Sequence, residues 1–419
     1  MTSTSTDDDT APTPGPLAGV RVLELGQLLA GPFAGAILGY FGAEVIKVEP
    51  PDGGDPIRNW REVRDGTSLW WYSLARNKKS VTIDLKAPRG QQLVRQLADR
   101  CDVLIENFRP GVMEQWGLGP DALKASNPGL IYARVSGFGQ TGPYASKPGF
   151  ASVCEGISGF RYVNGFPGQA PVRPNLSIGD TIAGIHAALG ITMALLARVR
   201  NGAPGQVVDV ALYESMFNLL EAVVPEFSGA GVVREASGTT VTGIVPTNTY
   251  PCRDGRYVVI GGNGDSIFKR LMVAVGRPDM ASDQRLAGNA GRVAHEQEID
   301  AALSAWCAQR NAADAIALLE QARVPAGPIY NVADMMADPH FRSRGLFEGV
   351  DIGGSELQIP AIMPRLIGTP GATRWPGPGL GSHTERVLRE LLGLDAEAIA
   401  ALRADGVIQV PDGGQVVRS

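Results

Sequence analysis

The sequence predicts an α/β protein with a parallel sheet, followed by a second, smaller α+β domain. Short apolar strands alternate with helical segments along the first part of the chain, which is the pattern of strand–helix–strand units covered by helices on both faces. The pattern changes in the second part, where a hairpin signal is followed by helices. The length of 419 residues exceeds the size at which one core stops growing, which favours two domains.

The first unit of the alternation covers residues 20–49. Residues 20–25 (VRVLEL) are expected to form a strand, 32–40 a helix with proline in its first turn, and 44–49 (EVIKVE) a second strand. The alternation continues with strand 80–85, helix 88–99, and strands 102–106 and 130–138. The glycines of this unit are Gly26, Gly31, Gly35 and Gly39. They do not follow the pattern G-x-G-x-x-G, which argues against a dinucleotide site. The spacing of four within the helix instead predicts that the helix packs closely on the sheet.

The most apolar stretch is residues 176–196, in which Asp180 is the only carboxylate. Apolar or small side chains occupy almost every face of the expected helix, so this helix should be buried. Asp180 at its start has two compatible interpretations. It can be the N-cap, accepting an unpaired backbone N–H, or it can be a nucleophile that the helix amides and dipole keep ionised.

The remaining elements are shorter. A turn at 201–205 precedes strand 206–212 and an amphipathic segment at 213–223, and residues 228–243 have the composition of a linker. The second domain is expected to contain a hairpin of strands 247–252 and 256–260 and helices at 265–275, 295–309 and 312–323. A final helix is expected near the chain end, at 384–392.

Composition excludes several classes of function. The formal charge of -5 without a Lys/Arg cluster argues against nucleic-acid binding. Four scattered cysteines without C-x-x-C spacing predict reduced thiols in a cytoplasm, and neither cysteines nor histidines have metal-ligand spacing, so no metal is expected. Residues 1–15 are polar and are expected to be a disordered tail rather than a signal peptide. No membrane span is expected, because a buried helix explains the stretch after Asp180.

Several short motifs occur in a defined order along the chain. They are PLAGVRVLELGQLLAGPFAGAILGYFGAEVIKVEPP at 16–51, NKKS at 77–80, ENFRPG at 106–111, SGFGQTGP at 136–143, GD at 179–180, VPAGP at 324–328 and GSHT at 381–384. Each motif alone is a weak signal. In this order and spacing, the chain resembles the class III CoA-transferases, the CaiB/BaiF or formyl-CoA transferase family, from about Pro16 to its end.

The resemblance implies a Rossmann-like large domain made from both ends of the chain, a small domain inserted by linkers, and a homodimer whose subunits interlock like links of a chain. The expected boundaries are a tail at 1–15, the first part of the large domain at 16–227, a linker at 228–245, the small domain at 246–328, and a linker with the last part of the large domain at 329–419.

The resemblance also implies that Asp180 is the covalent nucleophile. Such a carboxylate would take up the acyl group and CoA in turn, through an aspartyl anhydride and an aspartyl-CoA thioester. One thioester is exchanged for another, so no metal, nucleotide or redox cofactor is expected, and the CoA thioester is a substrate. The expected partners are an acyl-CoA, a small carboxylic acid and a second copy of the chain.

The CoA site is implied residue by residue. Ala30 would lie beside the pantetheine and thiol end, Ile83 and Lys86 beside the adenine, and Asn107, Phe108 and Arg109 along the nucleotide. Arg and Lys suit phosphate oxygens. A solvated surface charge is the alternative for both; it competes evenly with binding at Lys86, whereas binding is favoured at Arg109. Gln115 and Pro50 stand where some family members carry basic residues, so the phosphate contacts should be partly rearranged.

Phe150 separates two functions within this fold. The related α-methylacyl-CoA racemases carry a histidine at this position as a base, and phenylalanine cannot move a proton. Three aromatic residues could line an acyl pocket or belong to the core: Phe150, Trp60 and Trp70. Gly261–Gly264 can be a mobile lid or a plain turn after a strand.

The expected activity is therefore transfer of CoA from an acyl-CoA, with succinyl-CoA as the donor, to a four- or five-carbon dicarboxylate. Residues 161–167 and 171–174 resemble family members that act on such diacids. Arg173 is the first candidate cation for the second carboxylate and Arg161 the second, with an exposed arginine before a proline as the alternative for Arg173. A racemase-like isomerase is the alternative function, and a non-catalytic CoA-binding protein is the third.

Overall fold

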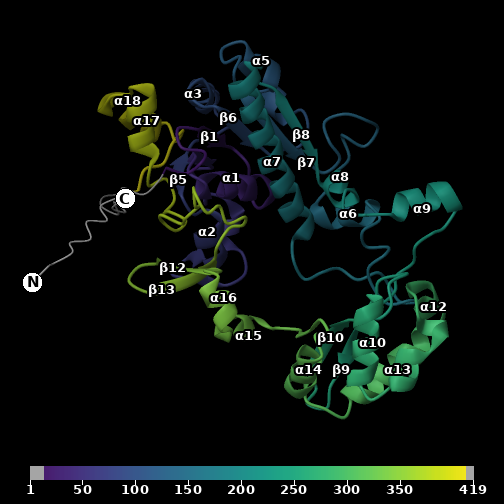
Figure 1. Cartoon of the computed structure of the whole chain (residues 1–419). Coiled ribbons are helices and arrows are strands. Elements are labelled where there is room, and N and C mark those ends of the chain that lie inside the picture. Colours follow the sequence, from purple (N-terminus) through teal and green to yellow (C-terminus); the bar gives the residue numbers. More distant parts are fainter. Residues whose placement is uncertain (1–13, 412–419) are drawn as a thin grey trace, which may run out of the picture. The chain divides into compact units, whose positions relative to one another are not determined.

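The computed structural model describes residues 14–411 and divides the chain into two compact units (Figure 1). The large unit comprises the chain up to Ser158, Pro174–Leu220 and the chain from Gly345 on, and the small unit comprises Gly159–Arg173 and Glu221–Arg344. Residues 1–13, most of the expected tail, lie outside the described residues. The small unit includes more of the chain than the small domain expected at 246–328. The domain boundaries remain a prediction.

A six-stranded parallel sheet forms the centre of the large unit, in the order β5-β2-β1-β6-β7-β8. Its strands are β1 (Arg21–Glu24), β2 (Glu44–Glu49), β5 (Lys78–Thr82), β6 (Val103–Glu106), β7 (Ile131–Ser136) and β8 (Val207–Ala211). The predicted parallel sheet is confirmed, although the strand expected at 80–85 begins and ends earlier, as β5. The strand order reverses between β1 and β6, and ligands bind in such folds beyond the carboxyl ends of the strands at this point.

Helices from both ends of the chain cover the sheet. Successive residues of β1 point to opposite faces: Val22 packs in a core with α1 (Ala30–Tyr40) and α7 (Ile178–Asn201). Leu23 packs in a second core with α3 (Pro88–Ala98), α17 (Thr384–Leu392) and α18 (Ala396–Ala404). Figure 1 shows α17 and α18, in yellow, beside the purple and blue elements of the first third of the chain. The prediction that 384–392 is the final helix is wrong, because α18 follows and completes this core.

The glycines of α1 face the sheet, as their spacing predicts. A Cβ on Gly31 would lie 3.4 Å from Ile105 Cγ2, one on Gly35 would lie 1.9 Å from Glu24 Oε2, and one on Gly39 would lie 3.2 Å from Val45 Cγ2. Helix α1 therefore approaches β6, β1 and β2 closely because it carries no side chain at these positions.

The prediction that the helix after Asp180 is buried on every side is wrong for the single chain. Helix α7 buries one face, which includes Ala183, Ala187 and Ile191. Its other face exposes apolar side chains, among them Met193 at 60%. Among the helices of residues 14–411, α7 alone is long and apolar enough to span a membrane. The core helices of soluble proteins can have the same length and composition.

The large unit contains further short elements around the sheet. They are 3₁₀ helix Pro56–Asn59, β3 (Val63–Arg64), β4 (Thr67–Ser68), α2 (Leu69–Leu74), α4 (Val112–Gln115), α5 (Pro120–Lys124), α6 (Ala151–Ile157), α8 (Leu212–Phe217), β12 (Phe347–Asp351) and β13 (Glu356–Pro360). The amphipathic segment expected at 213–223 is helical only as far as Phe217.

The small unit has its own core beneath a three-stranded sheet in the order β11-β10-β9. Its elements are α9 (Val223–Ala230), β9 (Thr247–Pro251), β10 (Tyr257–Gly261), α10 (Asp265–Ala274), α11 (Pro278–Ser282), 3₁₀ helix Gln284–Leu286, α12 (Asn289–Ala294), α13 (Glu296–Cys307), α14 (Ala312–Gln321), β11 (Ala326–Pro328), α15 (Val332–Ala337) and α16 (Pro339–Ser343). The predicted hairpin is present as β9 and β10. Residues 228–230 belong to α9, so the expected linker begins inside a helix.

The glycines at 261–264 are held in place within the small unit. The N–H of Gly261 donates to the Pro325 carbonyl at 3.0 Å, and that of Gly262 donates to the Pro246 carbonyl at 2.8 Å. A Cβ on Gly262 would lie 2.5 Å from Leu271 Cδ2. These contacts favour the turn interpretation of this segment over a mobile lid.

Candidate active site

The loop from β1 to α1 passes the carboxyl end of β6, where Asn107 follows that strand. Asn107 Oδ1 accepts a hydrogen bond from the Gln27 N–H at 2.8 Å, and its Nδ2 donates to the Gln27 carbonyl at 2.8 Å. A Cβ on Gly26 would lie 3.0 Å from Asn107 Oδ1, so a side chain there would displace the amide. The structure thus brings the predicted CoA residues Asn107 and Ala30, the first residue of α1, to one loop.

A buried ionic cluster supports the same loop from inside the protein. Lys47 Nζ lies 3.0 Å from Glu24 Oε1 and 2.8 Å from Asp55 Oδ2, and it donates to the Gly26 carbonyl at 2.8 Å. Asp55 accepts a hydrogen bond from the Leu28 N–H at 3.1 Å. Leu28 has a left-handed φ of 62°, which persists only where surrounding contacts hold it. Burial lowers the pKa of Lys47, but the charges of Asp55 and Glu24 outweigh burial and raise it above its usual value.

Asp180 is the third residue of α7 and lies in its first turn. The prediction that Asp180 is the N-cap is wrong, because the helix begins at Ile178 and the cap position belongs to Ser177. One turn later, a Cβ on Gly184 would lie 2.8 Å from the Ala30 carbonyl oxygen. Residues four apart share a helix face, so Asp180 lies on the face of α7 that meets the start of α1.

Helix α6 packs beside the first turn of α7 and carries two buried polar residues, Cys154 and Glu155. Burial and, to a smaller extent, the charges of Asp180 and Glu155 together raise the pKa of the Cys154 thiol to about 11. The thiol donates to the Gly137 carbonyl at 3.3 Å. Cys154 is therefore protonated near neutral pH and is a poor nucleophile beside Asp180.

The other predicted CoA residues lie near the carboxyl ends of β5 and β6. Lys86 and Arg109 are exposed, and Phe108 is half-buried in edge-to-face contact with Trp116, with ring centroids 5.2 Å apart. Ile83 is fully buried in the core, so its side chain is not open to a ligand in this conformation. The CoA-binding roles of all these residues stay predictions.

The predicted substrate residues do not form one group in the structure. Phe150 precedes α6 and is 73% exposed, and Trp60 is also exposed, so neither is a core residue of the single chain. Trp70 is half-buried and lies under the Arg61 guanidinium, 4.4 Å from the ring centroid. Arg173 belongs to the small unit, and its role stays a prediction.

An apolar cavity of about 360 Å³ lies beside the first turn of α7 within the large unit. Helix α7 contributes Thr181 and Ile185 to it, α1 contributes Phe33, and α2 contributes Trp70. Its position beside the first turn of α7 makes it a candidate for an apolar part of a ligand. Of these residues the sequence singled out only Trp70.

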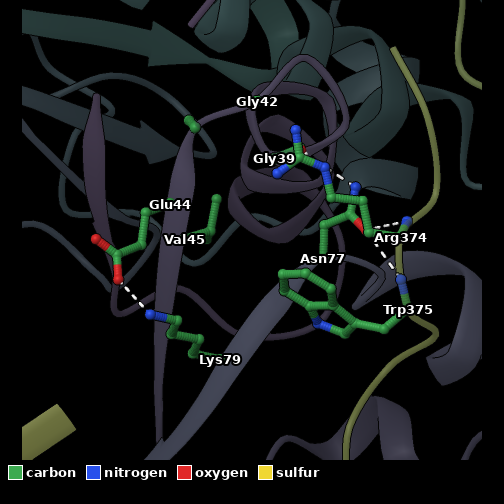
Figure 2. Close-up of a pocket in the computed structure, with 9 residues that line it drawn as sticks. Gly39, Gly42, Glu44, Val45, Asn77, Lys79, Arg374 and Trp375 are labelled. Atoms are coloured by element: carbon green, nitrogen blue, oxygen red, sulfur yellow. Dashed lines mark hydrogen bonds and ion pairs between the residues drawn. The ribbon is translucent and has the colours of Figure 1, made fainter. Parts of the chain in front are cut away.

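The NKKS motif at 77–80 lies at the opposite, amino-terminal edge of the sheet. Figure 2 shows a pocket of about 230 Å³ there, in which Asn77 Oδ1 accepts hydrogen bonds from the N–H groups of Arg374 and Trp375 at 2.7 and 3.3 Å. Lys79 forms an ion pair with Glu44. The Asn77 hydrogen bonds attach the last part of the chain to the edge strand β5, and the Lys79 ion pair joins β5 to β2, so Asn77 and Lys79 have structural roles.

Sequence reasoning missed Lys47, Asp55 and Glu155. A charged residue inside an apolar strand, as Lys47 is in EVIKVE, was the available signal. Its partners Glu24 and Asp55 are distant from it in sequence, so only the fold shows that the three meet.

The chain matches known proteins over almost its whole length. The family model described as CoA-transferase family III matches residues 17–384. A succinyl-CoA–D-citramalate CoA-transferase of Chloroflexus aurantiacus is 48% identical over 399 residues, covering 94% of this chain and 98% of that protein. A succinate–glutarate CoA-transferase of Agrobacterium fabrum is 37% identical, covering 91% and 97%. The crystal structure of a CaiB/BaiF family protein from Brucella suis superposes with a TM-score of 0.80 at 34% identity, covering 90% of this chain and 100% of that one.

Proposed function

The chain belongs to CoA-transferase family III, and we propose that it transfers CoA from succinyl-CoA to a four- or five-carbon dicarboxylate. The observation that carries this proposal is the 48% identity to a succinyl-CoA–D-citramalate CoA-transferase across almost the full length of both proteins. Similar relatives are named as succinyl-CoA–L-malate and succinate–glutarate CoA-transferases. The names of these relatives share succinyl-CoA or succinate together with a second diacid.

In the proposed mechanism the Asp180 carboxylate attacks the donor thioester carbonyl, which forms an aspartyl–acyl anhydride and expels the CoA thiolate. The thiolate attacks the aspartyl carbonyl, giving an aspartyl-CoA thioester and the free donor acid. The acceptor carboxylate attacks this thioester and releases the thiolate again. The thiolate then attacks the acceptor acyl carbonyl of the new anhydride, which yields the product thioester and restores Asp180. The position of Asp180 in the first turn of α7, facing the start of α1, supports this role.

Two other functions remain as alternatives. An isomerase of the racemase type would exchange the α-proton for deuterium without moving CoA, and Phe150 disfavours it because phenylalanine supplies no base. A non-catalytic CoA-binding protein would bind succinyl-CoA without turnover.

Incubation of the protein with succinyl-CoA and a panel of mono- and dicarboxylic acids, read by mass spectrometry of the CoA thioesters, tests the proposal. We expect new thioesters of four- or five-carbon diacids with equimolar release of succinate. Release of free CoA alone, or α-deuterium uptake from heavy water without exchange, would contradict it.

We predict that Arg173→Ala weakens the preference for diacids over monoacids about 10- to 100-fold, because a charge-assisted hydrogen bond to the second carboxylate contributes about 1.5–3 kcal/mol. Arg161 is the second candidate: it is half-buried, and its Nε has no hydrogen-bond partner in the described structure. The ratio of kcat/KM for a diacid to that for the matching monoacid is the measurement. An unchanged ratio in Arg173→Ala with a lowered ratio in Arg161→Ala would move the role to Arg161.

We further propose an interlocked homodimer in the cytoplasm. The exposed apolar face of α7, which includes Leu189, Met193 and Leu196, supports an interface, since such patches mark association surfaces. Subunits linked in this way separate only on unfolding, so folding and assembly are coupled. Light scattering and mass photometry should show a dimer down to nanomolar concentration, and folded monomers there would contradict the proposal. Fractionation of the source cells tests the location.

A further inference from the structure

Glu155, which has no step in the proposed mechanism, lies fully buried between α6 and the first turn of α7, with 0% of it exposed. Its Oε1 accepts a hydrogen bond from the Gly179 N–H at 3.4 Å. Gly179 directly precedes Asp180, so this bond acts one peptide away from the proposed nucleophile. A carboxylate is costly to bury, and its burial at this position calls for an explanation.

The first turn of a helix exposes N–H groups that have no partner within the helix. In α7 the side chain of the cap residue, Ser177, makes no cap hydrogen bond. Glu155 supplies an acceptor from the neighbouring helix instead, and its negative charge lies at the positive end of the α7 dipole. Glu155 of α6 therefore takes the role of a capping side chain for the first turn of α7.

Gly179 also packs closely against side chains of α6. A Cβ on Gly179 would lie 3.2 Å from Ala151 Cβ and 3.4 Å from both Cγ and Oε1 of Glu155. Ala151 and Glu155 are four residues apart and share one face of α6. The first turn of α7 packs against this face of α6.

We propose that Glu155 is a positioning residue for CoA transfer: its acceptor oxygen and its packing fix the Gly179 peptide, and thereby the direction in which the Asp180 carboxylate meets the thioester carbonyl. The inference rests on the proposed nucleophilic role of Asp180. The hydrogen bond and the shape of the side chain carry the effect, so an amide of the same size can replace the carboxylate.

Three variants test this inference in the full-length protein. Glu155→Leu keeps most of the volume and removes the acceptor, Glu155→Gln keeps both, and Val153→Ala changes the exposed side of the same helix as a control. We expect Glu155→Leu to lower kcat about 10²-fold, as small misplacements of a reacting group do, with little change in the KM for succinyl-CoA. Glu155→Gln should restore kcat to within about 3-fold of wild type on the same principle, and Val153→Ala should match wild type.

A purely structural role would lower the melting temperature of Glu155→Leu and leave kcat unchanged when the assay is run well below that temperature, which would overturn the inference. An equal loss in Glu155→Gln would also overturn it, because charge rather than positioning would then be responsible. If Glu155→Leu does not fold, Gly179→Ala replaces it: its Cβ must push Ala151 away, and an unchanged kcat in this variant would overturn the inference. Failure of the proposed function is separate, since the wild type would then show no exchange or Asp180→Asn would stay active.

Discussion

Asp180→Asn is expected to abolish CoA exchange, lowering kcat by about 10⁴-fold or more, the scale seen when a covalent nucleophile is removed. Asparagine keeps the size and the polar oxygen of aspartate in the first turn of α7, but its amide cannot form the anhydride. Folding should be retained, because the first-turn change costs about 1 kcal/mol or less. Steady-state exchange assays and thermal melts of the variant and the wild type measure the two quantities.

Chemical trapping identifies the same residue independently. Hydroxylamine added during turnover should leave a hydroxamate on Asp180, and borohydride should reduce the thioester form to an alcohol at the same position, both read by peptide mass spectrometry. Labels on another side chain, or substantial activity in Asp180→Asn, would show that the mechanism is wrong although the family is right. Cys154 is the neighbour to inspect for misplaced label, and its raised pKa predicts that it carries none.

The sheet was predictable because its strands are short apolar segments bounded by polar turns. The predicted strand EVIKVE has the same bounds in the structure as β2, and both faces of a central parallel strand are buried, so the run of valine and isoleucine is a sufficient signal. The same rule could not show why Lys47 is tolerated inside this strand. Its burial depends on Glu24 and Asp55, and sequence patterns contain no information on pairing at such separations.

Helix α7 shows a different limit. Its apolar composition predicts burial. Composition does not indicate which of the two apolar faces packs against its own chain and which one is available to a partner. The start of the helix was missed as well: it begins at Ile178, and the first turn contacts α6 through Gly179, which packs against Ala151 and Glu155. Asp180 stood out as the single carboxylate, yet its role as nucleophile came from the family resemblance and remains a prediction, as do the CoA residues.

Gly35→Ala is expected to destabilise the protein severely, although Gly35 lies in a helix where alanine is normally the better residue by about 0.5–1 kcal/mol. A Cβ there would lie 1.9 Å from Glu24 Oε2. The carboxylate cannot simply move, because Lys47 Nζ is 3.0 Å from its Oε1 and Lys78 Nζ is 2.8 Å from its Oε2. Either α1 must lift from the sheet or Lys47 and Lys78 lose their ion pairs with Glu24, and breaking a buried pair costs about 3–5 kcal/mol.

The matched control for this variant is Gly31→Ala, in the same helix and on the same face. Its Cβ would meet Ile105 Cγ2 at 3.4 Å, an ordinary contact, so the gain in helix propensity should keep its stability near that of the wild type. Melting temperatures are to be compared at one protein concentration, because assembly contributes to apparent stability. Gly35→Ala should melt well below Gly31→Ala or fail to accumulate as folded protein. Equal melting temperatures would show that the Glu24–Lys47–Lys78 cluster can rearrange without loss.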